Sequence, residues 1–415
     1  MSVYNTVGSS TNTFTNNKKT KLVAANIQDA RLFSKASVSK MSQSEFQGKK
    51  FGKSYTLTIT GTPKVVNGVV ADPSDLTEYE VPVRLDNDNT SVELGVWQRL
   101  GDIESFQSEV ASPFAIGLVR TQEKKIIANE ILKAAQTVIV PLVGGASGAS
   151  VEALSKAGAK LRKLAVSGEM VGFLDPDSAS EITQKSLNKF NTNVETFNKL
   201  YGDAAIGRFA QINWVETPDL FEISTPASAA TGSVTLTAIQ DADNNTIGFE
   251  PVDTISGTNL YKGAVFTATG LKVVDCSGIQ TSADYSFVVL EANAAGTSAK
   301  VVPVRITIDG KNCNNPNAWV PAGTSTLTLV SGLGTSKKYA VCSARSKGSF
   351  CFDTYRFDDL PGSENENVST VGGSSVKMST YGDGTTLTKF VRLDAPYAAA
   401  QFNHRENVVI FFEIP

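Results

Sequence analysis

The chain has little of the chemistry that enzymes and metal proteins commonly use. Its 415 residues include one histidine, His404, and four cysteines, none of them in a C-x-x-C pair. Zinc sites need closely spaced Cys and His ligands, so we expect no metal centre and interpret the cysteines as reduced, buried thiols. No pair of carboxylates is marked by its spacing, and His404 fits a structural or surface position. The sequence therefore predicts no catalytic residues and no cofactor.

Long apolar runs are also absent. No stretch of about twenty apolar residues exists, so no membrane-spanning helix is predicted and no membrane partner is expected. The first 21 residues are polar and rich in Thr and Asn, without the apolar centre of a secretory signal. We therefore expect the chain to be made and used in a cytoplasm.

Charge is unevenly distributed. Residues 1–53 hold nine Lys and Arg against two acidic residues, a net charge of +7, whereas the whole chain carries −3 and the remainder therefore −10. A basic arm on an acidic body can touch nucleic acid or an acidic neighbour, or it can be a solvated tail. The lysines that we nominate for contact with nucleic acid or a neighbour are Lys18, Lys19, Lys21, Lys49 and Lys50.

Residues 54–97 have the pattern of a β ribbon. Apolar residues alternate with threonine from Tyr55 to Thr60, which is typical of a strand with one polar face. Asn67-Gly68 between valine pairs is a strong hairpin signal, and Pro82 indicates an edge strand. Such a ribbon is too thin to have a core, so we expect it to lie on another molecule.

A helical block follows. Pro113 after Ser112 begins an apolar pattern of helical spacing that Pro141 stops, which predicts one long helix over residues 113–140. A second helix is expected from Val151 to Leu164. A third is expected after Asp175-Pro176-Asp177, with Ser178 and Glu181 as a capping box, and a fourth after Thr192.

The rest of the chain is rich in predicted strands. Turn residues recur every eight to twelve positions across residues 225–339, which indicates a compact barrel or sandwich inserted as its own unit. The apolar run from Val408 to Phe412 is typical of a buried strand that closes the main core. The predicted fold class is α+β.

Two loops invite a chemical interpretation. Gly145-x-x-Gly148 lies ahead of a helix, but the first glycine of a dinucleotide-binding turn is missing and the residues before it are predicted to continue a helix. Asp241, Asp243 and Asn245 occupy the expected tip of a β-hairpin without the ligand spacing of a calcium loop. A solvated turn and an acidic contact finger remain the two interpretations of that tip.

The order of these parts resembles the major capsid protein of tailed bacteriophages, which has the Hong Kong 97-like fold. Within that family the chain looks most like the coat protein of short-tailed Salmonella phages, which carries an inserted β-barrel domain. The string Ile127-Ala128-Asn129-Glu130-Ile131 is similar to one in its spine helix, and Asp175-Pro176-Asp177 is similar to one of its helix starts. The implied parts are an N-terminal arm (1–53), an extended β-loop (54–97), a peripheral domain (98–202) with the spine helix (113–140), an axial domain (203–224 and 340–415) and the inserted barrel (225–339).

The resemblance implies a structural shell subunit rather than an enzyme. Such a subunit would assemble with itself into the hexamers and pentamers of an icosahedral capsid around double-stranded DNA, with scaffolding, portal and decoration proteins as further partners. It would be located in the virion after assembly in the host cytoplasm. The expected intersubunit contact residues are Asp241, Asp243, Asn245, Arg305, Tyr55, Asn67, Gly68 and Arg84.

Two other functions remain open. A tail or fibre protein would fit the β-rich C-terminal half, although fibres rarely carry a helical block in mid-chain. An enzyme with a nucleotide site at residues 145–148 is the second alternative.

Overall fold

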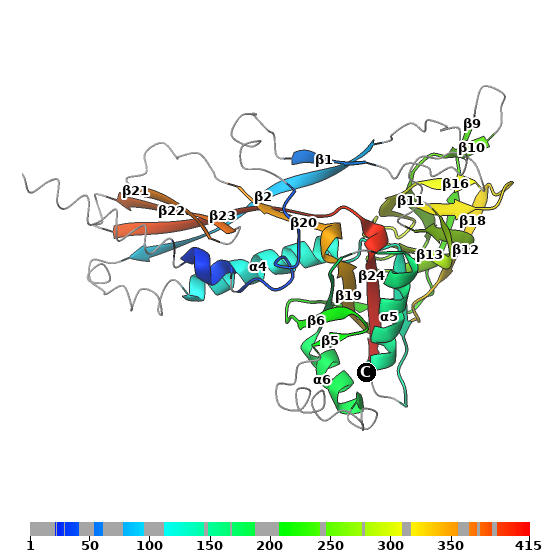
Figure 1. The fold of residues 1–415 in the computed structure, drawn as a ribbon, viewed down its shortest axis with the longest axis horizontal. Helices are drawn as coiled ribbons and strands as arrows, with labels where there is room; N and C mark the ends of the chain where they lie inside the picture. The colour runs from blue at the N-terminus through cyan, green and yellow to red at the C-terminus, as the bar shows by residue number, and fades with distance from the viewer. Residues whose placement is uncertain are drawn as a thin grey trace, which may run out of the picture. The chain divides into compact units, whose positions relative to one another are not determined.

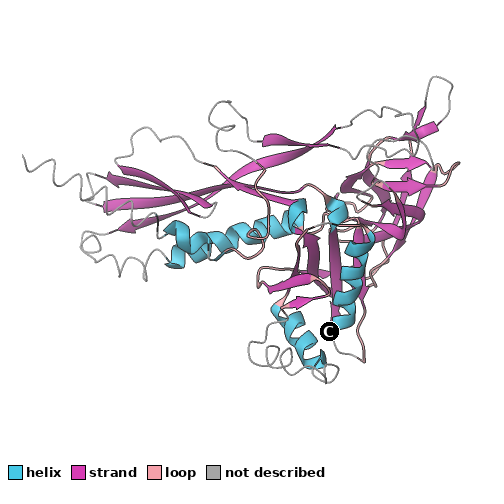
Figure 2. Cartoon of the chain, in the orientation of Figure 1, coloured by secondary structure: helices cyan, strands magenta, loops and turns pink. Residues whose placement is uncertain are grey.

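The structure, a computed structural model, is described here for most of the chain. The described residues are 21, 23–28, 30–40, 54–60, 78–94, 112–144, 148–166, 168–186, 207–240, 246–275, 279–308, 317–355, 365–371, 374–383 and 388–415. Strands make up most of them (Figure 2). They belong to two compact units. The first unit draws on Met1–Leu57, Pro82–Ile126 and Cys351–Ala400, and the second on Thr58–Val81, Ile127–Phe350 and Gln401–Pro415.

The first unit contains a six-stranded sheet with the order β1-β2-β23-β22-β21, in which β20 also pairs with β23. The two long strands β2 and β23 form its centre, and they are antiparallel with Leu85 opposite Ala398 and Leu94 opposite Lys389 (Figure 1). The strand and helix bounds are β1 Ser54–Thr60, β2 Glu78–Leu94, α4 Ser112–Glu130, β20 Phe350–Thr354, β21 Asn365–Val371, β22 Ser374–Asp383 and β23 Thr388–Gln401.

Helix α4 packs one face into the core of this unit. Its buried positions follow helical spacing, and they contact apolar residues of β22 and β23. Helical residues between 21 and 30 complete the cluster, so this part of the predicted arm is packed on its own chain. The buried members are Val23, Ala24, Ile27, Ala115, Leu118, Val119, Val376, Met378, Leu393 and Ala395.

The prediction that the long helix runs to Val140 is wrong. Helix α4 ends at Glu130, and Gln136–Val140 forms strand β3, parallel to the C-terminal strand β24 (Asn407–Ile414). The side-chain amide of Asn407 donates hydrogen bonds to the carbonyl oxygens of Ile131 (3.1 Å) and Lys133 (3.0 Å). These bonds hold the turn between α4 and β3, and the β-branched residues that follow favour a strand.

The second unit is built on a seven-stranded mixed sheet with the order β3-β24-β19-β4-β6-β5, in which β7 also pairs with β19. The central strands β24 and β19 are buried along almost their whole length, as predicted for the apolar run near the C-terminus. The remaining bounds are β4 Met170–Leu174, β5 Arg208–Phe209, β6 Ile212–Glu216, β7 Glu222–Ser224 and β19 Lys338–Ser346.

Two helices pack against this sheet. Helix α5 (Val151–Lys163) was predicted, and its buried residues Leu154 and Leu161 join the core formed by β3 and β24 (Figure 1). Helix α6 (Pro176–Ser186) was predicted to begin after Asp177, but it begins at Pro176, so the capping box of Ser178 and Glu181 is not its cap. The carboxylate of Asp175 accepts hydrogen bonds from the backbone N–H of Asp177 (3.1 Å) and Ser178 (3.5 Å), because a proline at the first helical position leaves the preceding residue as N-cap.

An eleven-stranded sheet lies in the chain between β7 and β19, two strands that pair with each other. The two ends of the chain segment that forms this sheet lie side by side, since the N–H of Thr225 donates to the carbonyl of Lys337 at 2.8 Å. The bounds are β8 Thr231–Thr235, β9 Ala238–Gln240, β10 Thr246–Phe249, β11 Val252–Thr258, β12 Val265–Val274, β13 Gln280–Val288, β14 Glu291–Ala292, β15 Ser298–Val304, β16 Ile306–Ile308, β17 Ala318–Val320 and β18 Thr326–Ser331.

This inserted sheet has a core of its own. Phe266, Phe287 and Tyr285 are among its fully buried side chains. Its strand order runs from β14 to β9, and the pairings between the described residues do not join these two ends. The described sheet is therefore not a closed barrel.

The two units divide the chain differently from the predicted domains. Residues 127–186 were assigned to a peripheral domain, but their strands β3 and β4 belong to the same sheet as β19 and β24. Residues 351–400 were assigned to the axial domain, but their strands pair with β2 in the first unit. The observed units depend on pairing between strands that are far apart in the sequence, and local sequence patterns do not indicate which strands pair.

Candidate functional site

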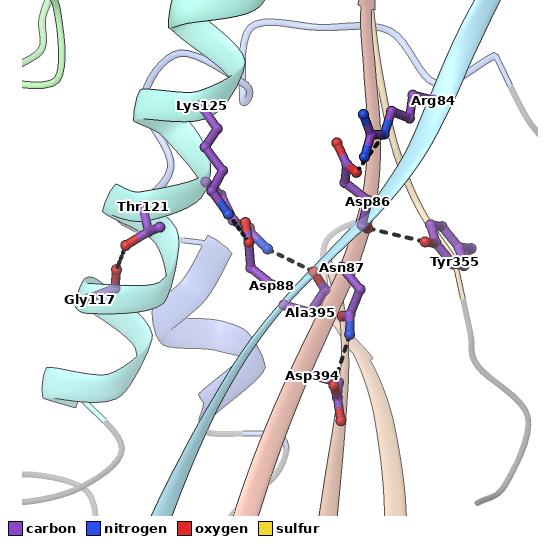
Figure 3. Close-up of polar contacts among 11 residues, drawn as sticks. Arg84, Asp86, Asn87, Asp88, Gly117, Thr121, Lys125, Tyr355, Asp394 and Ala395 are labelled. Carbon is purple, nitrogen blue, oxygen red and sulfur yellow. Dashed lines mark hydrogen bonds and ion pairs between the residues drawn. The ribbon is translucent and has the colours of Figure 1, made fainter. Parts of the chain in front are cut away.

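Polar contacts join the strand β2 to the helix α4 and to its other neighbours in the first unit (Figure 3). Asp88 on β2 forms an ion pair with Lys125 on α4, and the Asp88 side chain is only 12% exposed. Arg84 pairs with Asp86 on the same strand at 3.1 Å, but both of these side chains are well exposed. The first pair fixes the ribbon to the helix, whereas exposed pairs of the second kind contribute little to stability.

Polar contacts also join β2 to the neighbouring strands. Asp394 on β23 accepts two close hydrogen bonds from Arg392, at 3.0 Å from Nε and 2.8 Å from Nη2, and another from the side chain of Asn87 at 2.9 Å. The hydroxyl of Tyr355 donates to the carbonyl of Asp86 at 3.1 Å, and burial raises the pKa of Tyr355 to about 12. The hydrogen bond between Asn87 and Asp394 joins one position of β2 to one position of β23, so it favours a single register of these two strands.

A buried carboxylate of α4 holds the N-terminal segment. Glu123 is 1% exposed and accepts hydrogen bonds from the N–H of Phe33 at 2.6 Å, the N–H of Ser34 at 3.2 Å and the hydroxyl of Ser34. Gln122 beside it donates to the carbonyl of Ala395 on β23 at 2.7 Å. One turn of α4 therefore binds both the segment before the ribbon and the strand that pairs with the ribbon.

Arg31 completes this cluster. Its guanidinium donates to the side chains of Gln122 at 3.0 Å and Ser34 at 3.3 Å, and it lies 4.4 Å from the centroid of the Phe352 ring. Burial lowers the pKa of Arg31 to about 10, and the charge of Glu123 acts in the opposite direction. The group stays charged at neutral pH, so a buried cation and a buried anion face each other within a hydrogen-bonded network.

A second carboxylate, Asp353 on β20, binds the segment six residues further on. It accepts hydrogen bonds from the hydroxyl of Ser39 at 2.6 Å, the N–H of Lys40 at 3.2 Å and the thiol of Cys351 at 2.9 Å. Val38 also forms a parallel bridge with Cys351. Residues 33–40 are thus fixed to the rest of the first unit at two points.

These contacts fix segments of the first unit to one another. Within the described ranges there is no group of three or more His, Cys, Asp and Glu residues that could hold a metal ion. In that same part of the chain, no helix has the length and apolar character to cross a membrane.

His404 and two of the cysteines are buried. Burial was predicted for the cysteines, and for His404 a structural position was one of two predicted alternatives. His404 lies in a short 3₁₀ helix, and burial together with Arg405 lowers its pKa to about 3. Cys342 and Cys351 are free thiols in the interior, and burial raises the pKa of both. Cys276 and Cys313 lie outside the described residues.

The predicted contact residues that the structure describes do not form one cluster. Tyr55 is 7% exposed and packs with Val83 and Ala398, so its side chain belongs to the core of the first unit. Arg84 and Lys21 are exposed. Arg305 is half-buried between β15 and β16 in the second unit, where its N–H donates to the side chain of Asn317 at 3.0 Å.

The predicted acidic hairpin is present at its base. Strands β9 and β10 are antiparallel, with Gln240 opposite Thr246. The tip between them lies outside the described residues, as do several other predicted contact residues. These are Asp241, Asp243, Asn245, Asn67, Gly68, Lys18, Lys19, Lys49 and Lys50.

The residues before the glycine-containing segment ahead of α5 were predicted to be helical, but they are not. The residues before it form strand β3, so the segment is a strand, a turn and a helix. Gly145 lies outside the described residues, and the backbone at Gly148 is packed so closely that an added Cβ would lie 2.1 Å from the carbonyl oxygen of Pro141. A phosphate-binding turn needs open N–H groups, and this packing gives no such cradle at Gly148.

Sequence reasoning missed the residues that anchor the arm. The sequence patterns gave no reason to single out Glu123 or Arg31. The available signal was weak: the short apolar spacing of Val23 and Ile27 is compatible with a helix that packs.

Comparisons with known proteins give structural similarities only. A scan for known protein families finds no match, and a search of curated proteins finds none either. Similar solved structures include the capsid of the cyanophage P-SCSP1u (10% identity, 92% of this chain and 87% of that chain, TM-score 0.43) and the capsid of Ralstonia phage GP4 (7%, 88% and 85%, 0.43). A virus-like particle from Pyrococcus furiosus is another (8%, 95% and 97%, 0.40). TM-scores this low do not establish a shared fold on their own.

Proposed function

We propose that this chain is the major capsid protein of a tailed bacteriophage, with a Hong Kong 97-like fold. The observation that carries the proposal is the order and bonding of its elements. An anchored N-terminal segment precedes the long strands β1 and β2, the nineteen-residue helix α4 follows, and the chain then forms a mixed sheet that its C-terminal strand completes. Capsid proteins are also the class that the structural comparisons return.

The contacts of α4 support a role in assembly. An assembly subunit has to hold its extended segments in one conformation, since a disordered segment loses binding free energy when it orders on a neighbour. Glu123 and Asp353 fix residues 33–40, and Asp88 fixes the ribbon to the helix. Many copies joined through such pre-arranged segments bind cooperatively although each single contact is weak.

The finer features follow from the resemblance. We infer that residues 225–339, with their own sheet and adjoining ends, correspond to the inserted domain of the coat protein of short-tailed Salmonella phages. The exposed β9–β10 hairpin with Asp241 and Asp243 would contact a basic residue such as Arg305 of another copy. Scaffolding, portal and decoration proteins, packaged DNA and location in the virion belong to the same proposal.

Electron microscopy of the purified chain tests the function. We expect closed shells of uniform size, alone or with a co-expressed scaffolding protein. Long filaments would support the tail or fibre alternative and overturn the capsid assignment. Persistent monomers that are thermally stabilised by nucleotides would support the enzyme alternative.

A further inference from the structure

A pocket in the second unit combines an edge strand with a row of lysines. It has a volume of about 360 Å³ and lies between β3 and α5. Strand β3 is the last strand of the seven-stranded sheet and forms its floor. The lining residues are Thr137, Val138, Ile139, Ala159, Lys156, Lys160 and Lys163.

The three lysines follow one face of α5. Their spacing of four and then three residues puts them one above another on a helix, over an axial length of about 10 Å. Lys156 and Lys163 are exposed and Lys160 between them is half-buried. The helix therefore places three lysines along one face, and all three line the pocket.

Lys160 is fixed in place. Its Nζ donates to the carbonyl of Thr137 on β3 at 2.6 Å, which occupies a backbone acceptor on the edge strand. Burial lowers the pKa of Lys160, Asp284 raises it and Lys163 lowers it again. An ammonium has three donors, so Lys160 has two left for a ligand.

The pocket has an excess of positive charge. Within the described chain Lys163 has no ion pair, and Lys156 pairs only with Glu152 at 2.9 Å, where both side chains are more than 60% exposed. Asp284, the nearby acid that acts on Lys160, is itself paired with Lys272 at 2.6 Å. An anionic ligand would find charge here that the protein does not neutralise.

We propose that this pocket binds the phosphodiester backbone of double-stranded DNA. Lysine ammonium groups bind phosphate as point charges, and the length of the row corresponds to about three nucleotides of one strand at 3.4 Å each. No aromatic side chain lines the pocket on which an unpaired base would stack, so duplex DNA fits better than single strands. The identity of the occupant rests on the proposed capsid function, in which packaged DNA lies against the subunit.

The test uses the full-length chain and a DNA duplex of mixed sequence, with affinity measured across a series of salt concentrations. The pocket variant carries Lys156→Glu and Lys163→Glu, and it leaves the bonded Lys160 intact. A variant with Lys185→Glu and Lys300→Glu makes the same charge change at exposed lysines outside the pocket. Matching thermal unfolding midpoints in the three proteins establish that both variants fold.

We expect the pocket variant to bind DNA at least tenfold more weakly near 0.1 M salt. The slope of log affinity against log salt should decrease by about 2, because each lost phosphate contact removes about 0.9. The matched variant should keep the wild-type slope. Equal slopes in the two variants would overturn the inference. It would also be overturned if the wild-type chain bound polyglutamate as tightly as DNA and the pocket variant lost that binding, because an acidic polypeptide would then be the occupant.

Particle formation separates this inference from the proposed function. If the wild-type chain forms no shells but the pocket variant loses DNA affinity, the capsid function fails and the pocket stands as a DNA site. If shells form and the pocket variant binds DNA like the wild type, the capsid function stands and the pocket inference is overturned.

Discussion

At the scale of single residues, Glu123 shows how much one buried carboxylate can organise. Its oxygens accept hydrogen bonds from the N–H groups of Phe33 and Ser34. We expect Glu123→Ala to cost about 3 kcal/mol locally, because hydrogen bonds to a charged acceptor are lost and buried donors are left unsatisfied. Hydrogen exchange should show the amides of Phe33 and Ser34 exchanging on the order of 100-fold faster.

An exposed glutamate serves as the control. Glu152→Ala removes an exposed glutamate that pairs with Lys156, so it should change stability by at most about 0.5 kcal/mol and leave exchange at Phe33 unchanged. Unchanged exchange in Glu123→Ala as well would mean that the segment is held by its apolar contacts alone.

His404 predicts a pH dependence of stability. The pKa of His404 in the folded chain, about 3, lies below the unfolded value of about 6.5. At pH values between these two, the unfolded chain therefore binds the proton more readily than the folded chain. Stability is therefore full above pH 6.5 and decreases as the pH falls, by about 2 kcal/mol between pH 6.5 and 5.0. Within the described chain Nε2 of His404 has no hydrogen-bond partner, while the Tyr285 ring lies at 6.4 Å and Arg405 is adjacent.

The variant His404→Leu isolates this contribution. It removes the titrating group while it keeps a side chain of similar size in the same buried position. We expect its unfolding free energy, measured with urea at several pH values, to change much less between pH 6.5 and 5.0. An equally steep dependence in the variant would assign the effect to other groups.

At the scale of elements, the pairing of β4 with β6 depends on a glycine. Gly172 is opposite Trp214, and a Cβ at Gly172 would lie 2.2 Å from the indole. We expect Gly172→Ala to destabilise the protein by about 1 to 3 kcal/mol, since the indole has to move out of a packed position. Trp214 fluorescence and the urea midpoint measure the two consequences.

Gly117 offers a matched substitution on α4. Nothing lies within 4 Å of a Cβ added there, so Gly117→Ala should leave stability unchanged or raise it by up to about 1 kcal/mol through higher helix propensity. Equal effects at the two glycines would refute the packing explanation for Gly172.

Elements with a local signal could be predicted from the sequence, and those set by distant partners could not. The apolar face of α5 and the buried strand near the C-terminus were predicted because their patterns are complete within a few residues. The end of α4 was misplaced because Asn407, far along the chain, binds carbonyls of the turn that follows the helix. The anchoring role of Glu123 was invisible for the same reason, since its partners lie about ninety residues away.

At the scale of the whole molecule, the inserted sheet should fold on its own. Its ends meet at Thr225 and Lys337, and most of its core comes from its own strands. We expect residues 225–337 expressed alone to give a β-type circular dichroism spectrum and one cooperative thermal transition. A companion chain in which a short Gly-Ser linker replaces residues 226–336 should keep the seven-stranded sheet, because β7 and β19 are neighbours.

A featureless melt of the isolated segment would contradict this expectation. It would show that Ala135 and Leu164, which contact the inserted core from outside the segment, are essential to it.

Self-assembly into a closed shell is the central property assigned to this chain, and sedimentation velocity of the purified full-length protein at rising concentration measures it directly. We predict that above a threshold concentration one fast species of fixed size coexists with free subunits, because a closed shell stops growing when it is complete. A distribution that extends to larger sizes as concentration rises, or a single subunit species at every concentration, would contradict that assignment.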